Sequence, residues 1–326
     1  MKPVEIGSTN GGPVAFVGDA GCIVGRDGNK IRRWQVNDEK EVGQPMDAGS
    51  SVCSIAVSRD GKWIAGGTRS GRVVVWDANS HEKVSEFKGH RDDWVFAVDI
   101  SPDATRVASG SDDRTVRVWS RSTGQQLLGP FKHNYHVAAV KISPEGQFIA
   151  TATWKSVRIY DSRDGRLLSD NPIDVGSGMN QSLAWVSNSK QLFALSRDGK
   201  IHCLDVTNGQ ILSAWAIHSN NARCIALGSN GAFIAASARS SVSLWDTATH
   251  KQIGSLIHHQ NDAVYMAISA SNDLVISGGN KIILRKLPDI NVSSDFGHVG
   301  VFRCQIDPIH YNSLAATDTQ SHLPAG

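Results

Sequence analysis

The chain of 326 residues is long enough to bury a substantial hydrophobic core, in one large domain or in two ordinary ones. Its 40% hydrophobic and 20% charged residues are typical of a folded globular protein and exclude an intrinsically disordered chain. The 33 basic residues nearly balance the 31 acidic ones, so the overall charge gives no indication of binding to nucleic acid or to a membrane.

The N-terminal sequence and the spacing of the cysteines favour an intracellular protein. The N-terminal residues MKPVEIGSTNGG contain no apolar signal-peptide core, and no run reaches the roughly 18–20 apolar residues that a membrane span needs. The five cysteines are scattered without a CxxC pair, which favours buried reduced thiols in a reducing compartment. We therefore expect a cytoplasmic location, a nuclear one or both, and no membrane partner.

A short β-rich motif recurs along the chain at intervals of 39 to 44 residues. In chain order, its seven copies are IRRWQ (31–35), VVVWD (73–77), VRVWS (116–120), VRIYD (157–161), IHCLD (201–205), VSLWD (242–246) and IILRK (282–286). Such a regular interval predicts a protein built from repeats, each of them one supersecondary unit.

Each repeat shows the same succession of predicted strands and turns. One copy begins with the alternating strand SVCSIAVS, continues through the turn SRDG and the small-residue strand WIAGGT to VVVWD, and ends with the more polar KVSEFK. β-Branched residues separated by such turns are typical of antiparallel meanders. A lone four-stranded sheet cannot bury both faces, but radially stacked sheets bury them against each other. The sequence therefore predicts an all-β propeller of four-stranded antiparallel blades.

Residues 89–120 contain GH, SPD, SGSDD and VRVW in the order and spacing of a WD40 repeat. Over roughly residues 13–296 the chain resembles the WD40-repeat β-propeller family, and this resemblance implies about seven blades. It also implies that four side chains link the strands of one blade, namely His90, Ser109, Asp113 and Trp119. Stacked sheets bury polar turn groups, which then need hydrogen-bond partners of this kind.

We expect three parts in the chain. Residues 1–12 form an N-terminal segment that could supply an outer closing strand, residues 13–296 form the propeller, and residues 297–326 form a partial repeat and a tail. The C-terminal part leaves three alternatives open: an extension packed on a seven-bladed ring, which we favour, an eighth partial blade, or truncation of a longer protein.

His90, Ser109 and Asp113 are also the three side-chain types of a hydrolase triad. A catalytic serine, however, must be exposed and activated, with an oxyanion hole beside it. Ser109 lies between Ala108 and Gly110 without a GxSxG turn, which favours the structural role over the catalytic one. No phosphate-binding loop and no histidine–cysteine ligand spacing is present either. We therefore predict no enzymatic activity, no catalytic residue, no metal and no cofactor.

Function is expected in the loops at one rim of the propeller. The position before the aspartate of the second turn in each repeat commonly faces a partner in WD40 proteins. In six repeats this position is occupied by Arg26, Arg69, Asp112, Trp154, Arg197 and Arg239. Trp94 and His136 begin innermost strands and should line the same rim, with Trp94 and Trp154 as aromatic anchors.

The four arginines would surround the opening of the central channel. Their guanidinium groups match the geometry of carboxylates and phosphates, which favours an acidic or phosphorylated peptide. Ordinary turn solubility would explain the same arginines without any ligand. We expect a non-enzymatic scaffold or adaptor that binds a protein or peptide through its rim within a multi-subunit complex. The alternative is a propeller that binds nucleic acid or a phosphopeptide through the arginine-lined face, with nucleic acid the less favoured. The oligomeric state is left open.

Overall fold

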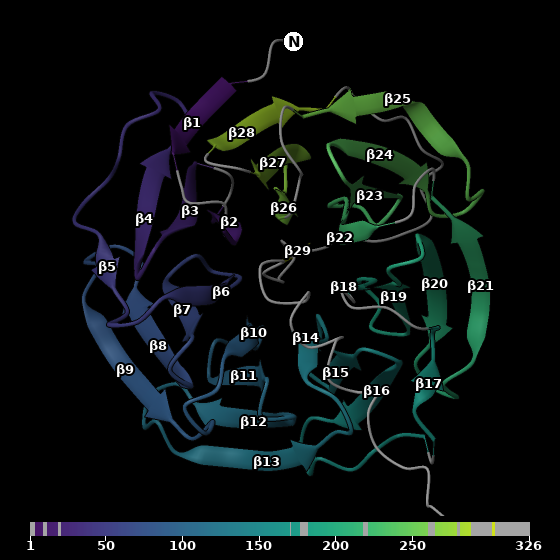
Figure 1. Ribbon diagram of the computed structural model, residues 1–326, viewed down its shortest axis with the longest axis horizontal. Coiled ribbons are helices and arrows are strands. Elements are labelled where there is room, and N and C mark those ends of the chain that lie inside the picture. Colours follow the sequence, from purple (N-terminus) through teal and green to yellow (C-terminus); the bar gives the residue numbers. More distant parts are fainter. Residues whose placement is uncertain are drawn as a thin grey trace, which may run out of the picture.

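The computed structural model describes residues 4–8, 12–18, 21–169, 171–176, 182–217, 221–259, 265–278, 281–287 and 302–303. Within these ranges the regular secondary structure consists of strands, and no helix is present, so none that could span a membrane. The strands form seven antiparallel sheets arranged radially around a central axis (Figure 1). The predicted all-β, seven-bladed propeller of four-stranded blades is therefore confirmed.

The sheets follow one another around the ring in chain order, and each blade runs from an innermost to an outermost strand (Figure 1). Blade 1 consists of β2 (Val14–Val17), β3 (Cys22–Asp27), β4 (Lys30–Gln35) and β5 (Met46–Asp47). Blade 2 consists of β6 (Val52–Val57), β7 (Trp63–Thr68), β8 (Arg72–Asp77) and β9 (Lys83–Lys88). Blade 3 consists of β10 (Val95–Ile100), β11 (Arg106–Ser111), β12 (Thr115–Ser120) and β13 (Gln126–Lys132).

The remaining blades repeat this order. Blade 4 consists of β14 (Val137–Ile142), β15 (Phe148–Thr153), β16 (Ser156–Asp161) and β17 (Ile173–Asp174). Blade 5 consists of β18 (Ser182–Trp185), β19 (Gln191–Leu195), β20 (Lys200–Asp205) and β21 (Ile211–Ala216). Blade 6 consists of β22 (Ala222–Leu227), β23 (Phe233–Ala238), β24 (Ser241–Asp246) and β25 (Gln252–His258). Blade 7 contains β26 (Tyr265–Ile268), β27 (Asp273–Gly278) and β28 (Lys281–Lys286).

Both ends of the chain contribute strands to blade 7. The N-terminal strand β1 (Val4–Ser8) pairs antiparallel with β28 as the outermost strand, and Lys281 Nζ lies 2.8 Å from Glu5 Oε2 across this pair. A fifth strand, β29 (Phe302–Arg303), pairs with β26 on the side of the ring's centre (Figure 1). The ring is thus closed by pairing between the two ends of the chain. The rest of the segment 297–326 lies outside the described residues.

The core lies between neighbouring blades. The third strand of blade 2 is buried almost completely, whereas only Phe87 is buried on its outermost strand. Phe87 stacks on Trp119 of blade 3, with 5.6 Å between the ring centroids. Small residues in the second strands let the blades approach closely: a Cβ atom at Gly110 would lie 2.6 Å from Val137 Cγ1 of the next blade. Because apolar faces meet across blades, each blade depends on its neighbours for burial.

The cysteines differ in their state. Cys22 and Cys203 carry buried thiols, and burial, with a smaller contribution from Asp205, raises the pKa of Cys203 to about 11. Cys224 is disulfide-bonded. The expectation of reduced cysteines is therefore wrong for Cys224.

Candidate functional site

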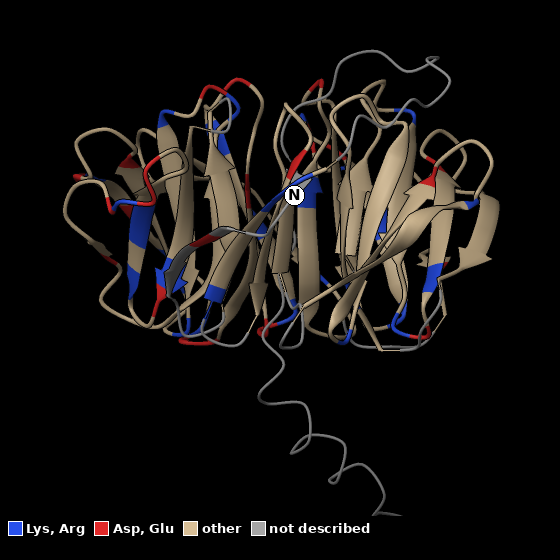
Figure 2. Ribbon diagram, turned by 90° about the horizontal axis from the view of Figure 1, so that it is seen from above, with Lys and Arg blue, Asp and Glu red and all other residues tan. Residues whose placement is uncertain are grey.

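We call one end of the ring the upper face. It carries the segments that lead into the innermost strands and the turns between the second and third strands, because successive strands of a blade alternate in direction. In blade 3 these are residues 89–94 and 112–114. Figure 2 shows the ring from the side, with turns and charged residues of both signs at its two ends. All rim positions predicted from the sequence belong to the upper face.

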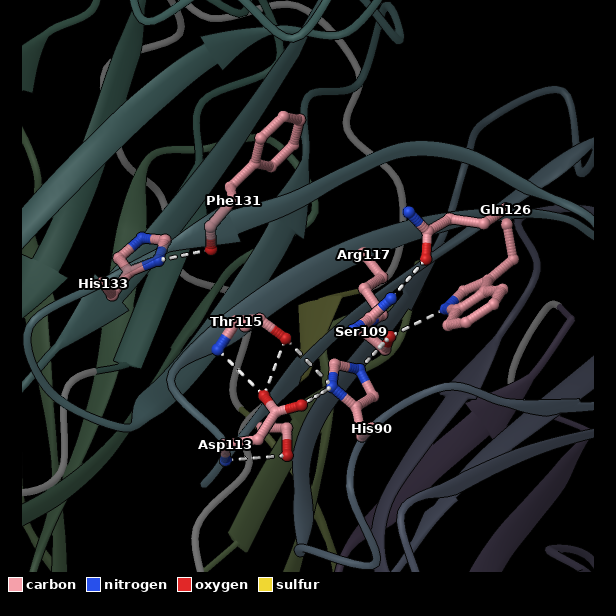
Figure 3. Close-up of polar contacts among 10 residues, drawn as sticks. His90, Ser109, Asp113, Thr115, Arg117, Gln126, Phe131 and His133 are labelled. Carbon is pink, nitrogen blue, oxygen red and sulfur yellow. Dashed lines mark hydrogen bonds and ion pairs between the residues drawn. The ribbon is translucent and has the colours of Figure 1, made fainter.

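Blade 3 contains a connected set of four polar side chains at this end (Figure 3). His90 Nδ1 lies 2.9 Å from Asp113 Oδ2, and His90 Nε2 lies 2.8 Å from Ser109 Oγ. Trp119 Nε1 donates a hydrogen bond of 2.8 Å to the same Ser109 oxygen. If Nδ1 donates to the carboxylate, the neutral ring accepts a hydrogen bond from the serine at Nε2. The structure thus brings together all four residues of the expected tetrad.

The same geometry leaves Ser109 without the properties of a nucleophile. Its exposure is 0%, and its oxygen already interacts with both His90 and Trp119. His90 is only 2% exposed, so a substrate cannot reach the pair without opening the blade. An attacking serine needs access to the substrate carbon and donors for the oxyanion. The tetrad therefore links strands within blade 3.

The carboxylate of Asp113 makes stability depend on pH. Burial alone would raise the pKa of Asp113, but the hydrogen bond and charge of His90, together with Thr115, lower it from 3.8 to about 2. Since the pKa in the folded state is depressed, the ionised group stabilises the fold above about pH 4, and this contribution disappears as the pH falls through about 2.

We expect this dependence to be visible in a comparison with Asp113→Asn. The difference in unfolding free energy between the wild type and the variant should shrink by about 2 kcal/mol between roughly pH 5 and pH 2. Denaturant titrations at a series of pH values measure it, and other carboxylates cancel in the comparison. A difference that stays constant with pH would contradict the assigned role of Asp113.

Blade 4 has a related but incomplete set. His133 Nε2 lies 3.0 Å from Thr151 Oγ1 and 3.5 Å from the Tyr160 hydroxyl. Its other ring nitrogen, Nδ1, lies 3.1 Å from the Phe131 carbonyl oxygen, where blade 3 has a carboxylate. Burial, reinforced by the positive charge of Arg158, lowers the pKa of His133 to about 4. Blade 4 thus keeps the histidine as a neutral ring.

Aromatic side chains form a continuous contact series on the upper face of blades 2 to 4. The Arg69 guanidinium lies 4.1 Å from the centroid of the Trp94 ring, at the start of the series. Trp94 contacts Phe96 edge to face at 5.7 Å, and Phe96 contacts His136 in the same way at 5.8 Å. Edge-to-face and cation–π contacts of this kind hold the rings in defined orientations.

The series continues into blade 4. The ring centroids of His136 and Trp154 are 6.4 Å apart, and those of Trp154 and Tyr135 are 6.3 Å apart. Burial and the nearby Arg114 lower the pKa of His136 to about 4, so this ring packs as a neutral aromatic group. We call the whole set the aromatic arc, which consists of Arg69, Trp94, Phe96, His136, Trp154 and Tyr135.

The arc joins four residues that the sequence predicted separately, namely Arg69, Trp94, His136 and Trp154. Sequence reasoning missed Phe96 and Tyr135, although both stand within two residues of predicted rim positions. Aromatic residues clustered where successive innermost strands begin, as in WVF and YH, are a signal that could have identified them.

The other rim positions do not form a ring of exposed arginines. Arg26 is only 7% exposed, and a Cβ atom at Gly12 would lie 2.6 Å from its Cδ, so the N-terminal segment covers it. Arg197 and Arg239 are exposed on blades 5 and 6. Asp112 is half-buried, and burial, together with Asp93, raises its pKa. The predicted arrangement of four arginines is therefore corrected to two exposed ones, one stacked on tryptophan and one covered.

No metal centre accompanies the arc in the described part of the ring. Among the described residues, no three potential metal ligands of the histidine, cysteine, aspartate or glutamate type gather in one place. Two of the cavities in the described part of the ring are small. One of about 200 Å³ adjoins Tyr135 in blade 4, and the other, of about 160 Å³, lies between blades 5 and 6 beside Leu212 and His250.

Comparison with known families agrees with this architecture. The model of the WD domain, G-beta repeat, matches residues 43–77, 81–120 and 125–161. Each matched segment contains the outermost strand of one blade and the first three strands of the next. The repeats therefore interlock the blades, in the same way that β1 locks blade 7.

Several characterised proteins share weak similarity with the chain. Subunit I of eukaryotic translation initiation factor 3 from Neurospora crassa is 26% identical over 189 residues, 52% of each chain. A U3 small nucleolar RNA-associated protein 15 homolog from Xenopus laevis is 23% identical over 67% of this chain and 42% of its own. Protein groucho from Drosophila melanogaster is 28% identical over 39% of this chain and 18% of its own. The chain spans about half or less of the length of these relatives.

Proposed function

Because this chain is a seven-bladed β-propeller that carries WD40 repeats, we propose that it is a non-enzymatic scaffold that binds a protein partner within a multi-subunit complex. The partner contacts the upper face along the aromatic arc. Relatives named as a subunit of a translation initiation factor and as an RNA-associated protein support a role inside larger assemblies. The same names support a cytoplasmic or nuclear location.

The aromatic arc is the observation that carries the proposal. Tyr135 is 37% exposed, and Trp94 and Trp154 are each half-buried, so their rings are anchored while part of their surface faces solvent. Tryptophan, tyrosine and arginine dominate the binding energy of protein interfaces, above all where neighbouring contacts hold them in place. A rigid propeller rim also loses little conformational entropy when a partner binds.

The test is a double variant, Trp94→Ala with Trp154→Ala, compared with the wild type by affinity purification and quantitative mass spectrometry. We expect the recovery of at least one partner of the wild-type protein to fall about tenfold or more. A tenfold fall corresponds to a loss of about 1.4 kcal/mol in binding free energy. Thermal melting verifies that the variant remains folded.

A matched control removes apolar surface elsewhere. Leu127→Ala with Ile211→Ala alters two exposed side chains on the outermost strands of blades 3 and 5 and should leave recovery unchanged. Equal loss in both double variants, or no loss in either, would refute the arc as the binding surface. Recovery of RNA instead of protein, with strong salt dependence and sensitivity to Arg197→Glu, would favour the nucleic-acid alternative.

A further inference from the structure

A pocket of about 200 Å³ opens on the upper face of blade 4, at the end of the aromatic arc. Its lining includes two cationic side chains, Lys155 and Arg158, and the polar groups of Asn134, Thr153 and Ser156. None of the residues that line it is an aspartate or a glutamate. The pocket therefore presents positive charge and hydrogen-bond donors without an anion of its own.

The corresponding position of blade 3 provides a comparison for this pocket. Ser109 pairs with Arg117 across the second and third strands of blade 3, and Thr151 pairs with Arg158 in the same way in blade 4. The two histidines also correspond, since His90 contacts Ser109 and His133 contacts Thr151. In blade 3 the far side of the histidine is occupied by a carboxylate.

Blade 4 lacks this carboxylate because its turn is shorter. Residues 112–114 separate the second and third strands of blade 3, whereas only Trp154 and Lys155 separate those of blade 4. A cation thus stands in the turn that carries Asp113 in blade 3. Asp174, which pairs with Ser156 on the outermost strand, accepts a hydrogen bond from the Gly176 amide.

The surrounding contacts keep the cations in place. Lys155 Nζ lies 5.6 Å from the centroid of the Tyr135 ring, the last member of the arc. Arg158 donates a hydrogen bond of 2.9 Å to the Lys132 carbonyl oxygen, which holds its guanidinium at the pocket. The depressed pKa of His133 is consistent with a site whose positive field has no internal counter-charge.

We propose that this pocket binds an anionic side chain of the partner, a carboxylate or a phosphate, between Lys155 and Arg158. This inference rests on the proposed function, because the segment that delivers the anion lies along the aromatic arc. Lysine and arginine together with hydroxyl and amide donors suit both oxyanions. Electrostatic attraction of this kind contributes most to the binding free energy where the ligand leaves bulk water.

Two small probes test the pocket without any partner, namely the N-acetyl methylamides of phosphoserine and of glutamate. Each is titrated into the full chain while the imidazole signals of His133 and His90 are followed by NMR. We expect saturable shifts of the His133 signals only. In Lys155→Gln the midpoint of the titration should rise about tenfold or more, and the melting temperature should stay near that of the wild type because Lys155 is exposed.

Arg117→Gln is the control, since it removes the blade 3 cation that corresponds to Arg158, outside the pocket, and should leave the titration unchanged. Saturation by phosphoserine alone identifies a phosphorylated partner, and saturation by both probes identifies an acidic one. No saturable His133 shift, or an unchanged midpoint in Lys155→Gln, overturns the pocket. In that case, loss of the partner in the tryptophan double variant would still support the aromatic arc as the binding surface. The two proposals can therefore be refuted independently.

Discussion

Replacing His90 by alanine is expected to lower the free energy of unfolding by about 3–5 kcal/mol, because a buried carboxylate loses its hydrogen-bond partner. The side chains of His90 and Asp113 are 0% and 3% exposed, so the variant leaves a carboxylate buried without its main partner. It also removes the hydrogen-bond partner of Ser109. Denaturant unfolding followed by circular dichroism measures the loss.

Two further substitutions separate the sources of this effect. Ser109→Ala removes a hydroxyl but leaves the His90–Asp113 pair, and should cost about 1–3 kcal/mol. His133→Ala in blade 4 removes the corresponding histidine from a site where Phe131 and Thr151, not a carboxylate, contact the ring. It should therefore cost less than His90→Ala. Equal losses of unfolding free energy in His90→Ala and His133→Ala would show that the Asp113 carboxylate does not contribute to the effect.

Replacing Trp185 by alanine should be about as damaging, at roughly 3–5 kcal/mol. Its exposure is 0%, on the innermost strand of blade 5. The indole donates a hydrogen bond of 3.2 Å to the Lys141 carbonyl oxygen in blade 4 and stacks on Phe148 at 6.4 Å. Trp185 thus fills the space between two blades, and its loss leaves a cavity there.

Trp185→Phe separates the ring from its hydrogen bond. Most of the apolar volume is retained, and the loss of the hydrogen bond to the Lys141 carbonyl oxygen should cost about 1 kcal/mol. Trp215→Ala is the control, because this tryptophan lies half-buried on the outermost strand β21, where it stacks on His250. A loss for Trp215→Ala as large as that for Trp185→Ala would contradict the interblade role.

The tetrad of blade 3 was predictable from the resemblance of residues 89–120 to a WD40 repeat. His90, Ser109, Asp113 and Trp119 stand in the best-preserved copy, and the structure joins them by direct contacts. Exposure at the rim was not predictable in this way. Whether an arginine faces solvent depends on segments far away in the chain, as the burial of Arg26 beneath Gly12 shows.

The sequence by itself determined the repeat and the strand order within each blade and favoured seven blades, because alternating apolar residues and turn residues act over a few positions. Only the tertiary structure decided how β1 completes blade 7, how Arg69 of blade 2 meets the aromatic residues of blades 3 and 4, and where a cationic pocket lies in blade 4. Those features arise from contacts between residues on different strands and, in part, on different blades. Local periodicity carries no record of which such side chains meet, since the stacking of the blades creates these contacts.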